Sequence, residues 1–174
     1  MSPLSPADEQ LLVGLLEKLG PSTMPVSVFN ALAAKVVLTG IELIILRRHA
    51  GWVEVLLLQR PADDPHWPGQ WHIPGTILRN SDAPEVLNAE GSYRPALLRI
   101  QTGELKVRVT NPRPVGSYFH RAERGVVNSL LFIGKADDNG EEGSYFPVDE
   151  LPDDIIGCHR PMIELAVEAY NSQH

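Results

Sequence analysis

The sequence predicts an α+β fold in which a mixed β-sheet is sandwiched between helices. Leucines recur at helical spacing near the start, and apolar residues form a second helical stripe near the end. Between them lie short runs rich in branched residues, which are typical of strands. These strands precede and follow a central helix without regular alternation, so a mixed sheet fits better than a parallel array. Because the chain has 174 residues, we expect one folded core.

The first predicted element is a helix with clear end signals. Ser5 stands at the N-cap, Pro6 at the first helical position, and Asp8 three residues after the cap. Leucines follow at helical spacing until Gly20-Pro21 stops the helix, near Leu19. We expect this leucine stripe to pack on its own domain, with a dimer interface as the alternative.

A short second helix is expected over residues 26–34, and the pattern changes to β at Lys35. The chain is therefore predicted to consist of a helical extension over 1–34 and a folded domain over 35–174. The first strands of that domain are expected over 36–38, 41–46 and 53–58.

Prolines and glycines divide the middle of the domain. Residues 61–70 hold three prolines and form a predicted loop, and 71–78 is a short strand broken by a Pro-Gly pair. A second, polar loop follows over 79–93, and long loops of this kind in compact domains are usually functional or mobile. A helix is then expected over 95–105.

A hairpin and a final helix complete the predicted fold. The hairpin consists of strands over 113–121 and 126–135, joined by a polar turn. An acidic loop around Asn139-Gly140 follows, and a helix over 156–170 closes the chain.

The charge of the chain is −7 and is unevenly distributed. Such a net charge argues against general nucleic-acid binding. Residues 44–136, however, hold twelve Lys or Arg against eight Asp or Glu, a net of +4. This region could attract a small anion such as a phosphate ester, and a solvated mixed surface is the alternative.

Other features predict the cellular setting. No apolar run approaches the roughly 18 residues that a membrane helix requires. The acidic start of the chain has no basic segment of the kind that targeting signals carry. We therefore expect no membrane association and a cytoplasmic location. Cys158 stands alone, so the chain has no internal disulfide and no cysteine-based zinc site.

A motif in the middle of the chain links these elements to a known family. The segment Val55-Leu-Leu-Leu-Gln-Arg60 is followed by a loop and by Pro68-Gly-Gln-Trp-His-Ile-Pro-Gly75. It resembles the Nudix hydrolase family (MutT-like), in which a strand ending in Gln-Arg precedes a Trp-x-x-Pro-Gly turn. The resemblance extends from about Val36 to Tyr170 and implies the Nudix fold, a mixed β-sheet between helices.

In that family the glycine opens the Nudix box: Gly, five residues, Glu, seven residues, Arg-Glu, an aliphatic residue, any residue, Glu-Glu, any residue, Gly and an aliphatic residue. The segment Arg99-Ile-Gln-Thr-Gly-Glu-Leu-Lys-Val107 aligns with its second half. Residues at i, i+3 and i+4 share a helix face, where three glutamates can gather Mg²⁺. The corresponding positions are Ile100, Gly103 and Glu104, so one carboxylate remains and the box is degenerate.

The spacing of the box also departs from the family. Gly75 and Arg99 are 24 residues apart, about ten more than the pattern requires. The first Glu of the box, which orients the box Arg, is assigned to Glu90, with Glu85 and Asp82 as the other candidates. The predicted role of Arg99 is to pair with this carboxylate, and a simple surface arginine is the alternative.

The resemblance and the local chemistry together predict the site residues. The catalytic candidates are Glu104, Arg99 and Glu90. The predicted metal ligands are Glu104, Glu90 and Glu85, which would hold Mg²⁺ or Mn²⁺ if the chain is active. If it is inactive, no cofactor is expected. The substrate-binding candidates are Arg60, Trp71, His72, Gly75 and His120. Structural roles are the alternative for four of these: an ion pair for Arg60, turn packing for Trp71, and hydrogen-bonded structural positions for His72 and His120.

Two functional hypotheses follow. One is a diverged Nudix-type hydrolase that acts on a nucleoside diphosphate linked to another moiety, by metal-assisted pyrophosphate hydrolysis, with activity weakened or lost. The other is a non-catalytic Nudix-fold module that binds a nucleotide or another anion. In both, the expected partner is a small nucleotide or phosphate ester, and a homodimer is the predicted assembly if the leucine stripe pairs.

Overall fold

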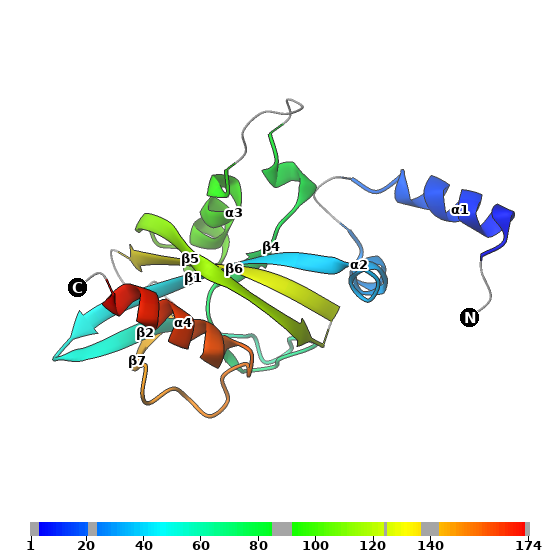
Figure 1. Cartoon of the computed structure of the whole chain (residues 1–174). Helices are drawn as coiled ribbons and strands as arrows, with labels where there is room; N and C mark the ends of the chain where they lie inside the picture. The colour runs from blue at the N-terminus through cyan, green and yellow to red at the C-terminus, as the bar shows by residue number, and fades with distance from the viewer. Residues whose placement is uncertain (1–3, 21–23, 85–91, 124, 137–142, 173–174) are drawn as a thin grey trace.

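The computed structural model shows a mixed sheet with helices on both faces (Figure 1). It describes residues 4–20, 24–84, 92–123, 125–136 and 143–172. The helices are α1 (Pro6–Leu16), α2 (Val26–Ala33), a short 3-10 turn (Asn80–Asp82), α3 (Arg94–Arg99), a π-helical segment (Ile100–Leu105) and α4 (His159–Asn171). The strands are β1 (Val37–His49), β2 (Trp52–Gln59), β3 (Trp71–His72), β4 (Gly75–Ile77), β5 (Val109–Ala122), β6 (Gly125–Ala136) and β7 (Gly143–Pro147).

The described strands form one seven-stranded sheet. Its main path is β3-β2-β1-β6-β5, while β4 pairs with β1 and β7 pairs with β2. Strands β1 and β6 are parallel, and the other pairs are antiparallel. The predicted α+β class with a mixed sheet is therefore confirmed.

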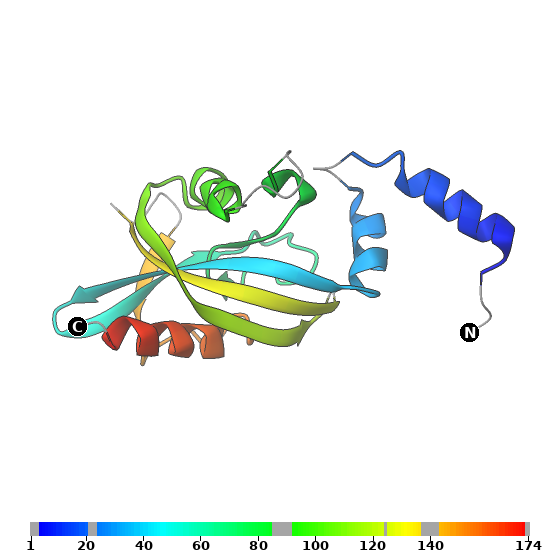
Figure 2. The ribbon, with the colours of Figure 1, turned by 45° about the horizontal axis from the view of Figure 1, so that its top comes forward.

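Side chains of β1 alternate between two cores, as the period of a strand requires. Leu43 and Ile45 pack on the face that α3 covers, whereas Ile44 and Leu46 pack on the face that α4 covers. Figure 2 shows α3 and α4 on opposite sides of the sheet. Each of these side chains is fully buried and contributes roughly 1.5–3 kcal/mol of transfer free energy.

The predicted central helix changes geometry halfway along its length. After α3, the segment from Ile100 to Leu105 is π-helical, and Lys106 ends it in a left-handed conformation (φ 55°). A π-turn is hydrogen-bonded from i to i+5 instead of from i to i+4. Ile100 and Leu105, at the two ends of this segment, are both buried in the core beneath α3. The expectation of a continuous α-helix to Leu105 is therefore wrong, because the α-helix ends at Arg99 and the three box positions lie in the π-helical segment.

The N-terminal helix is capped as predicted but lies in solvent. The side chain of Ser5 accepts a hydrogen bond from the amide of Asp8, and the Asp8 carboxylate accepts one from the amide of Ser5. Helix α1 ends at Leu16, three residues before the predicted end, and none of its residues is buried. Its leucines do not pack on the domain, so that expectation is wrong (Figure 1).

Two strand predictions also differ from the structure. Strand β1 runs unbroken through Gly40, because β4 and β6 pair with it on both sides at that point. Strand β7 was not predicted, since its partner β2 lies far away in the sequence and no local pattern marks the pair. The predicted turn at Asn139-Gly140 lies outside the described residues. Among the described helices, none has the length and apolar character needed to cross a membrane.

Candidate functional site

Gly75 stands between two carboxylates. Strand β4 pairs with β1 so that Gly75 lies opposite Glu42. Its amide donates a hydrogen bond to Oε2 of Glu104 (3.0 Å). A Cβ atom on Gly75 would lie 1.9 Å from Oε2 of Glu42. A residue with a side chain would therefore displace Glu42, so the glycine of the Pro-Gly turn is needed for this packing.

Glu104 is the box carboxylate that reaches this place. Burial raises the pKa of Glu104 above its ordinary value of 4.5, while the Gly75 amide and the charge of Arg60 act in the opposite direction. The side chain is thus both hydrogen-bonded to β4 and largely withdrawn from water.

The box arginine is held by a different residue from the one assigned to it. Arg99 forms an ion pair with Asp82, and its Nη2 also donates to the carbonyl oxygen of Ile77 (3.1 Å). Asp82 was the third candidate for this role, and its side chain is 5% exposed. Glu85 and Glu90, the other two candidates and the predicted metal ligands, lie outside the described residues. Arg99, the arginine of the box, is therefore anchored to the segment that follows β4.

Arg60 is also engaged by a neighbouring acid. Its guanidinium donates to Asp64 through Nε (2.9 Å) and through Nη2. Burial alone would raise the pKa of Asp64, but hydrogen bonds from the amides of Trp67 and His66, together with Arg60, lower it to about 2. This ion pair organises the proline-rich loop, as the structural alternative for Arg60 proposed.

The two tryptophans of this region have different surroundings. Trp71 packs edge-on against Phe146, with ring centroids 4.9 Å apart, in the core that α4 covers. Trp71 does not line either of the two hollows around Gly75, whereas Trp67 lines one of them.

Two adjoining hollows lie around Gly75. The larger one, here called the outer cleft, has a volume of about 700 Å³, and its lining includes Arg60, Gly75, Thr76, Arg79 and Glu104. The smaller one, here called the inner cavity, has a volume of about 100 Å³, and its lining includes Glu42, His72, His120, Ser129, Cys158 and His159. Leu38, Arg60, Gly75, Thr76 and Ile77 line both, so the two hollows meet at β4.

Three histidines of the inner cavity have low pKa values. Burial lowers the pKa of His72 to about 4 and that of His159 to about 3, and it also lowers the pKa of His120. All three are therefore neutral imidazoles at pH 7. The thiol of Cys158 is protonated there as well, because burial and the charge of Glu42 raise its pKa to about 11.

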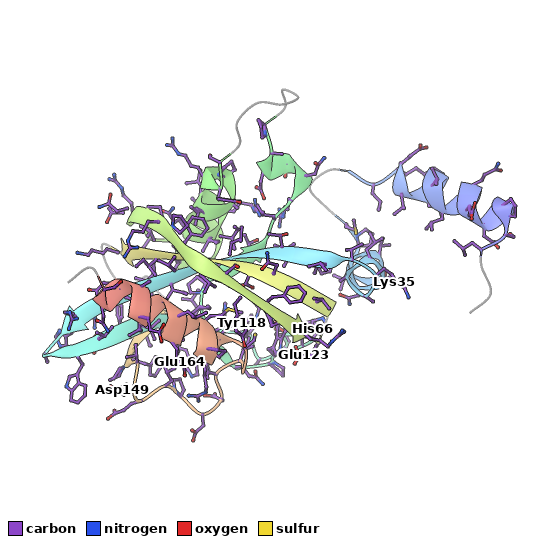
Figure 3. All side chains as sticks on the ribbon, in the orientation of Figure 1. Lys35, His66, Tyr118, Glu123, Asp149 and Glu164 are labelled. Carbon is purple, nitrogen blue, oxygen red and sulfur yellow. The ribbon has the colours of Figure 1, made fainter. Side chains whose placement is uncertain are left out.

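A row of polar side chains crosses three neighbouring strands in this cavity. Nε2 of His120 lies 3.3 Å from Oγ of Ser129, and that hydroxyl donates to Oε1 of Glu42 (3.1 Å). The ring of His120 stacks on Tyr118, which Figure 3 labels. The three groups come from β5, β6 and β1, and so the sheet itself fixes their geometry.

The described residues do not fit the metal site that the box implies. They contain no group of three or more His, Cys, Asp or Glu side chains able to hold an ion. Ile100 is 1% exposed in the core, and a Cβ atom on Gly103 would meet no atom within 4 Å. Two of the three box positions thus supply no oxygen ligand, and Mg²⁺ takes oxygen ligands.

Several residues of the site escaped prediction from the sequence. Glu42 carried a usable signal, because it is a lone charge inside the apolar run of the first strand. Asp64 lies four residues after Arg60, so its pairing was open to a local reading. Ser129 and His159 carried no signal, since their roles depend on contacts between distant segments. The predicted Glu104, Arg60, His72, Gly75 and His120 all line one or both hollows.

Comparison with solved structures places this arrangement in a known fold. By sequence, neither the protein-family models nor the curated proteins give a match. By structure, the chain is similar to the NUDIX domain of Shewanella oneidensis NrtR complexed with ADP ribose (TM-score 0.59, 18% identity, covering 91% of this chain and 97% of that one). It is also similar to a MutT NUDIX hydrolase from Burkholderia pseudomallei (TM-score 0.55, 16% identity, covering 75% and 98%).

A third similar structure is a longer chain, Shewanella oneidensis NrtR complexed with a 27mer DNA (TM-score 0.58, 16% identity). This chain spans 63% of that protein, and the match covers 78% of this chain. The structural similarity establishes the fold, and sequence identities this low leave the activity open. The chain therefore has the Nudix fold, which it shares with MutT-type hydrolases over most of its length.

Proposed function

We propose that this chain binds a nucleoside diphosphate linked to another moiety in the outer cleft, with metal-assisted pyrophosphate hydrolysis weakened or lost. The observation that carries this proposal is the placement of the three box positions. Glu104 contacts Gly75, whereas Ile100 lies in the core and Gly103 faces open space. The metal-binding part of the box is degraded, and the cleft beside it is retained.

The cleft has the size and charge for such a ligand. Its volume of about 700 Å³ lies within the range of roughly 300–1,000 Å³ that is common for small-molecule sites. Arg60 and the exposed Arg79 line it, and arginine binds phosphate oxygens in a bidentate manner. Because Arg60 already bonds to Asp64, Arg79 is the better candidate for a phosphate contact. The ADP ribose in the similar NrtR domain supports the ligand class.

The binding proposal is tested by calorimetric titration of the purified chain with ADP-ribose. We expect Arg79→Gln to raise Kd by about tenfold or more, since a hydrogen bond to a charged group contributes roughly 1.5–3 kcal/mol. The matched control is Arg108→Gln, an exposed arginine outside both hollows. An unchanged Kd for Arg79→Gln, or the absence of any binding by the wild-type chain, contradicts the proposal.

A diverged hydrolase is the second candidate, and the approach of both Glu42 and Glu104 to Gly75 favours it. The test measures release of phosphate products from nucleotide sugars, dinucleotides and nucleoside triphosphates with Mg²⁺ or Mn²⁺. Turnover that Glu104→Gln abolishes would establish the hydrolase and exclude a purely binding role. Absence of turnover together with ADP-ribose binding supports the binding module.

A further inference from the structure

The inner cavity has a fixed pattern of hydrogen-bond donors and acceptors, which starts at Ile73. The carbonyl oxygen of Ile73 accepts from Nδ1 of His72 (2.9 Å), so His72 carries its proton on Nδ1. The amide of Ile73 donates to Nδ1 of His159 (3.1 Å), so the neutral His159 carries its proton on Nε2. Nε2 is therefore an acceptor in His72 and a donor in His159.

The other side of the cavity is set by Ser129. A hydroxyl has one proton, and that of Ser129 is donated to Glu42. Nε2 of His120 must therefore donate to Oγ of Ser129, which leaves Nδ1 of His120 as an acceptor. This Nδ1 atom is buried and has no hydrogen-bond partner within the described part of the chain. Buried polar atoms in folded proteins are nearly always hydrogen-bonded, so such an atom marks a place for a ligand or a water.

Glu42 and the three imidazoles together thus offer the cavity more acceptors than donors. The acceptors are Nδ1 of His120, Nε2 of His72 and the carboxylate of Glu42, and the donor that the imidazoles supply is Nε2 of His159. Its volume of about 100 Å³ exceeds the roughly 10–15 Å³ that one water needs, so a group larger than a single water fits. We propose that the inner cavity receives an uncharged, hydrogen-bond-donating end of the ligand, and that Glu42 determines this specificity.

Two chemical groups have this character: the hydroxyls of a sugar, and the amino group of a nucleobase. A phosphate does not, because Arg60, which also lines the cavity, is already paired with Asp64, and the Glu42 carboxylate and the neutral histidines carry no positive charge. The phosphates would lie in the outer cleft, which meets the inner cavity at Gly75 and Thr76. The inference therefore rests on the proposed function, and it adds which part of the ligand enters the inner cavity.

The first test compares ADP-ribose with ADP, which lacks the second ribose, by calorimetry on the wild-type chain and on Glu42→Gln. The substitution keeps the size of the side chain and replaces one acceptor with a donor. If the sugar enters the cavity, Kd for ADP-ribose rises about tenfold or more and Kd for ADP does not change. If the base enters, both values rise equally. The control is Glu164→Gln on the outer side of α4, labelled in Figure 3, which changes neither.

The second test needs neither a variant nor phosphate binding. Ribose and adenosine are titrated separately into the wild-type chain, and the imidazole ¹⁵N resonances are recorded. We expect the resonances of His120 and His72 to move with one of the two ligands, while the exposed His49 stays unchanged. These spectra also show directly which nitrogen of each ring is protonated.

The two tests separate the inference from the proposed function. Imidazole shifts without any binding of ADP-ribose would contradict the proposed function and support the inner cavity as a site. Binding of ADP-ribose with no imidazole shift, and with an unchanged Kd in Glu42→Gln, would overturn the inference and leave the proposed function standing. Failure of every ligand in both tests overturns both.

Discussion

Arg99 and Asp82 form an ion pair that connects the end of α3 to the 3-10 turn after β4. Asp82 also accepts a hydrogen bond from the amide of Arg79 (2.8 Å), so one buried carboxylate holds two segments. The two residues are seventeen apart in the sequence, and the extra residues of the box therefore lie between them. The pair preserves the anchored arginine of the box although the loop is longer.

Replacing Asp82 should destabilise the fold. Asp82→Asn removes the charge that Arg99 faces, and the Arg99 side chain is only 28% exposed, so water compensates its charge poorly. We expect a loss of about 2 kcal/mol in the free energy of unfolding, the magnitude of a hydrogen bond to a charged group. Urea denaturation measures it, and Asp63→Asn, at an exposed position, is the control. Equal stability of both variants would show that the pair contributes nothing.

Glu104 should make the fold less stable as the pH rises. Its pKa is raised in the folded state by burial, so between about 4.5 and that raised value the folded chain binds the proton more tightly than the unfolded chain. The free energy of unfolding then falls with increasing pH over this window. In Glu104→Gln this contribution disappears, and the variant should be more stable than the wild-type chain at neutral pH. Urea denaturation from about pH 4 to about pH 8 measures the free energy of unfolding of both chains. We expect the advantage of Glu104→Gln to grow as the pH rises, and a difference that does not depend on pH contradicts the prediction.

The buried histidines should act in the opposite direction. His72 and His159 titrate at about 4 and about 3 in the folded chain but near 6.5 when unfolded. Below pH 6.5 the unfolded state binds more protons, so the free energy of unfolding falls as the pH is lowered through this window. His159→Gln keeps an acceptor for the amide of Ile73 and cannot titrate. A smaller decline in stability on acidification is expected for this variant, and an identical pH profile would rule the explanation out.

The N-terminal helix should be dispensable for folding. Helix α1 has no buried residue, so deletion of residues 1–16 is expected to change the free energy of unfolding by less than about 0.5 kcal/mol.

Helix α2, in contrast to α1, packs on the sheet, because a Cβ atom on Gly125 would lie 2.2 Å from the carbonyl oxygen of Ala33. Gly125→Ala, at φ +145°, should therefore cost about 1–3 kcal/mol.

The same deletion addresses assembly. Leu11, Leu12 and Leu15 of α1 are exposed, and a homodimer through this stripe remains a prediction. Sedimentation of the full chain and of the deletion variant measures it. A dimer that the deletion converts to a monomer supports the prediction, and a full-length monomer at all concentrations contradicts it.

Local signals in the sequence were reliable, and long-range contacts were not. The capping pair of Ser5 and Asp8 is three residues apart, so the sequence alone predicts it. The position of Glu42 depends on β4 and β6, which pair with β1 across long stretches of chain, and no pattern near Glu42 encodes that geometry. The partner of Arg99 stayed ambiguous because spacing within a longer loop does not select among three acids. The π-helical geometry of residues 100–105 escaped prediction because no pattern in the sequence marks it.

The two altered box positions should respond in opposite ways when glutamate is restored. Ile100→Glu places a carboxylate in the core beneath α3, at a position that is 1% exposed and surrounded by apolar side chains. Burying an unpaired charge is strongly unfavourable, so we expect a loss of at least about 3 kcal/mol in the free energy of unfolding. Gly103→Glu meets open space and replaces a poor helix former. Its stability should be unchanged or higher by up to about 1 kcal/mol.

Because Gly103 precedes Glu104, Gly103→Glu also tests whether this helix can still hold a metal. Two adjacent carboxylates provide more oxygen ligands than one, and calorimetric titration with Mn²⁺ measures any gain over the wild-type chain. If Ile100→Glu were tolerated and bound Mn²⁺, its side chain would have to leave the core. Stability of Ile100→Glu equal to that of Gly103→Glu would therefore contradict the burial of Ile100, because burial is what separates the two positions.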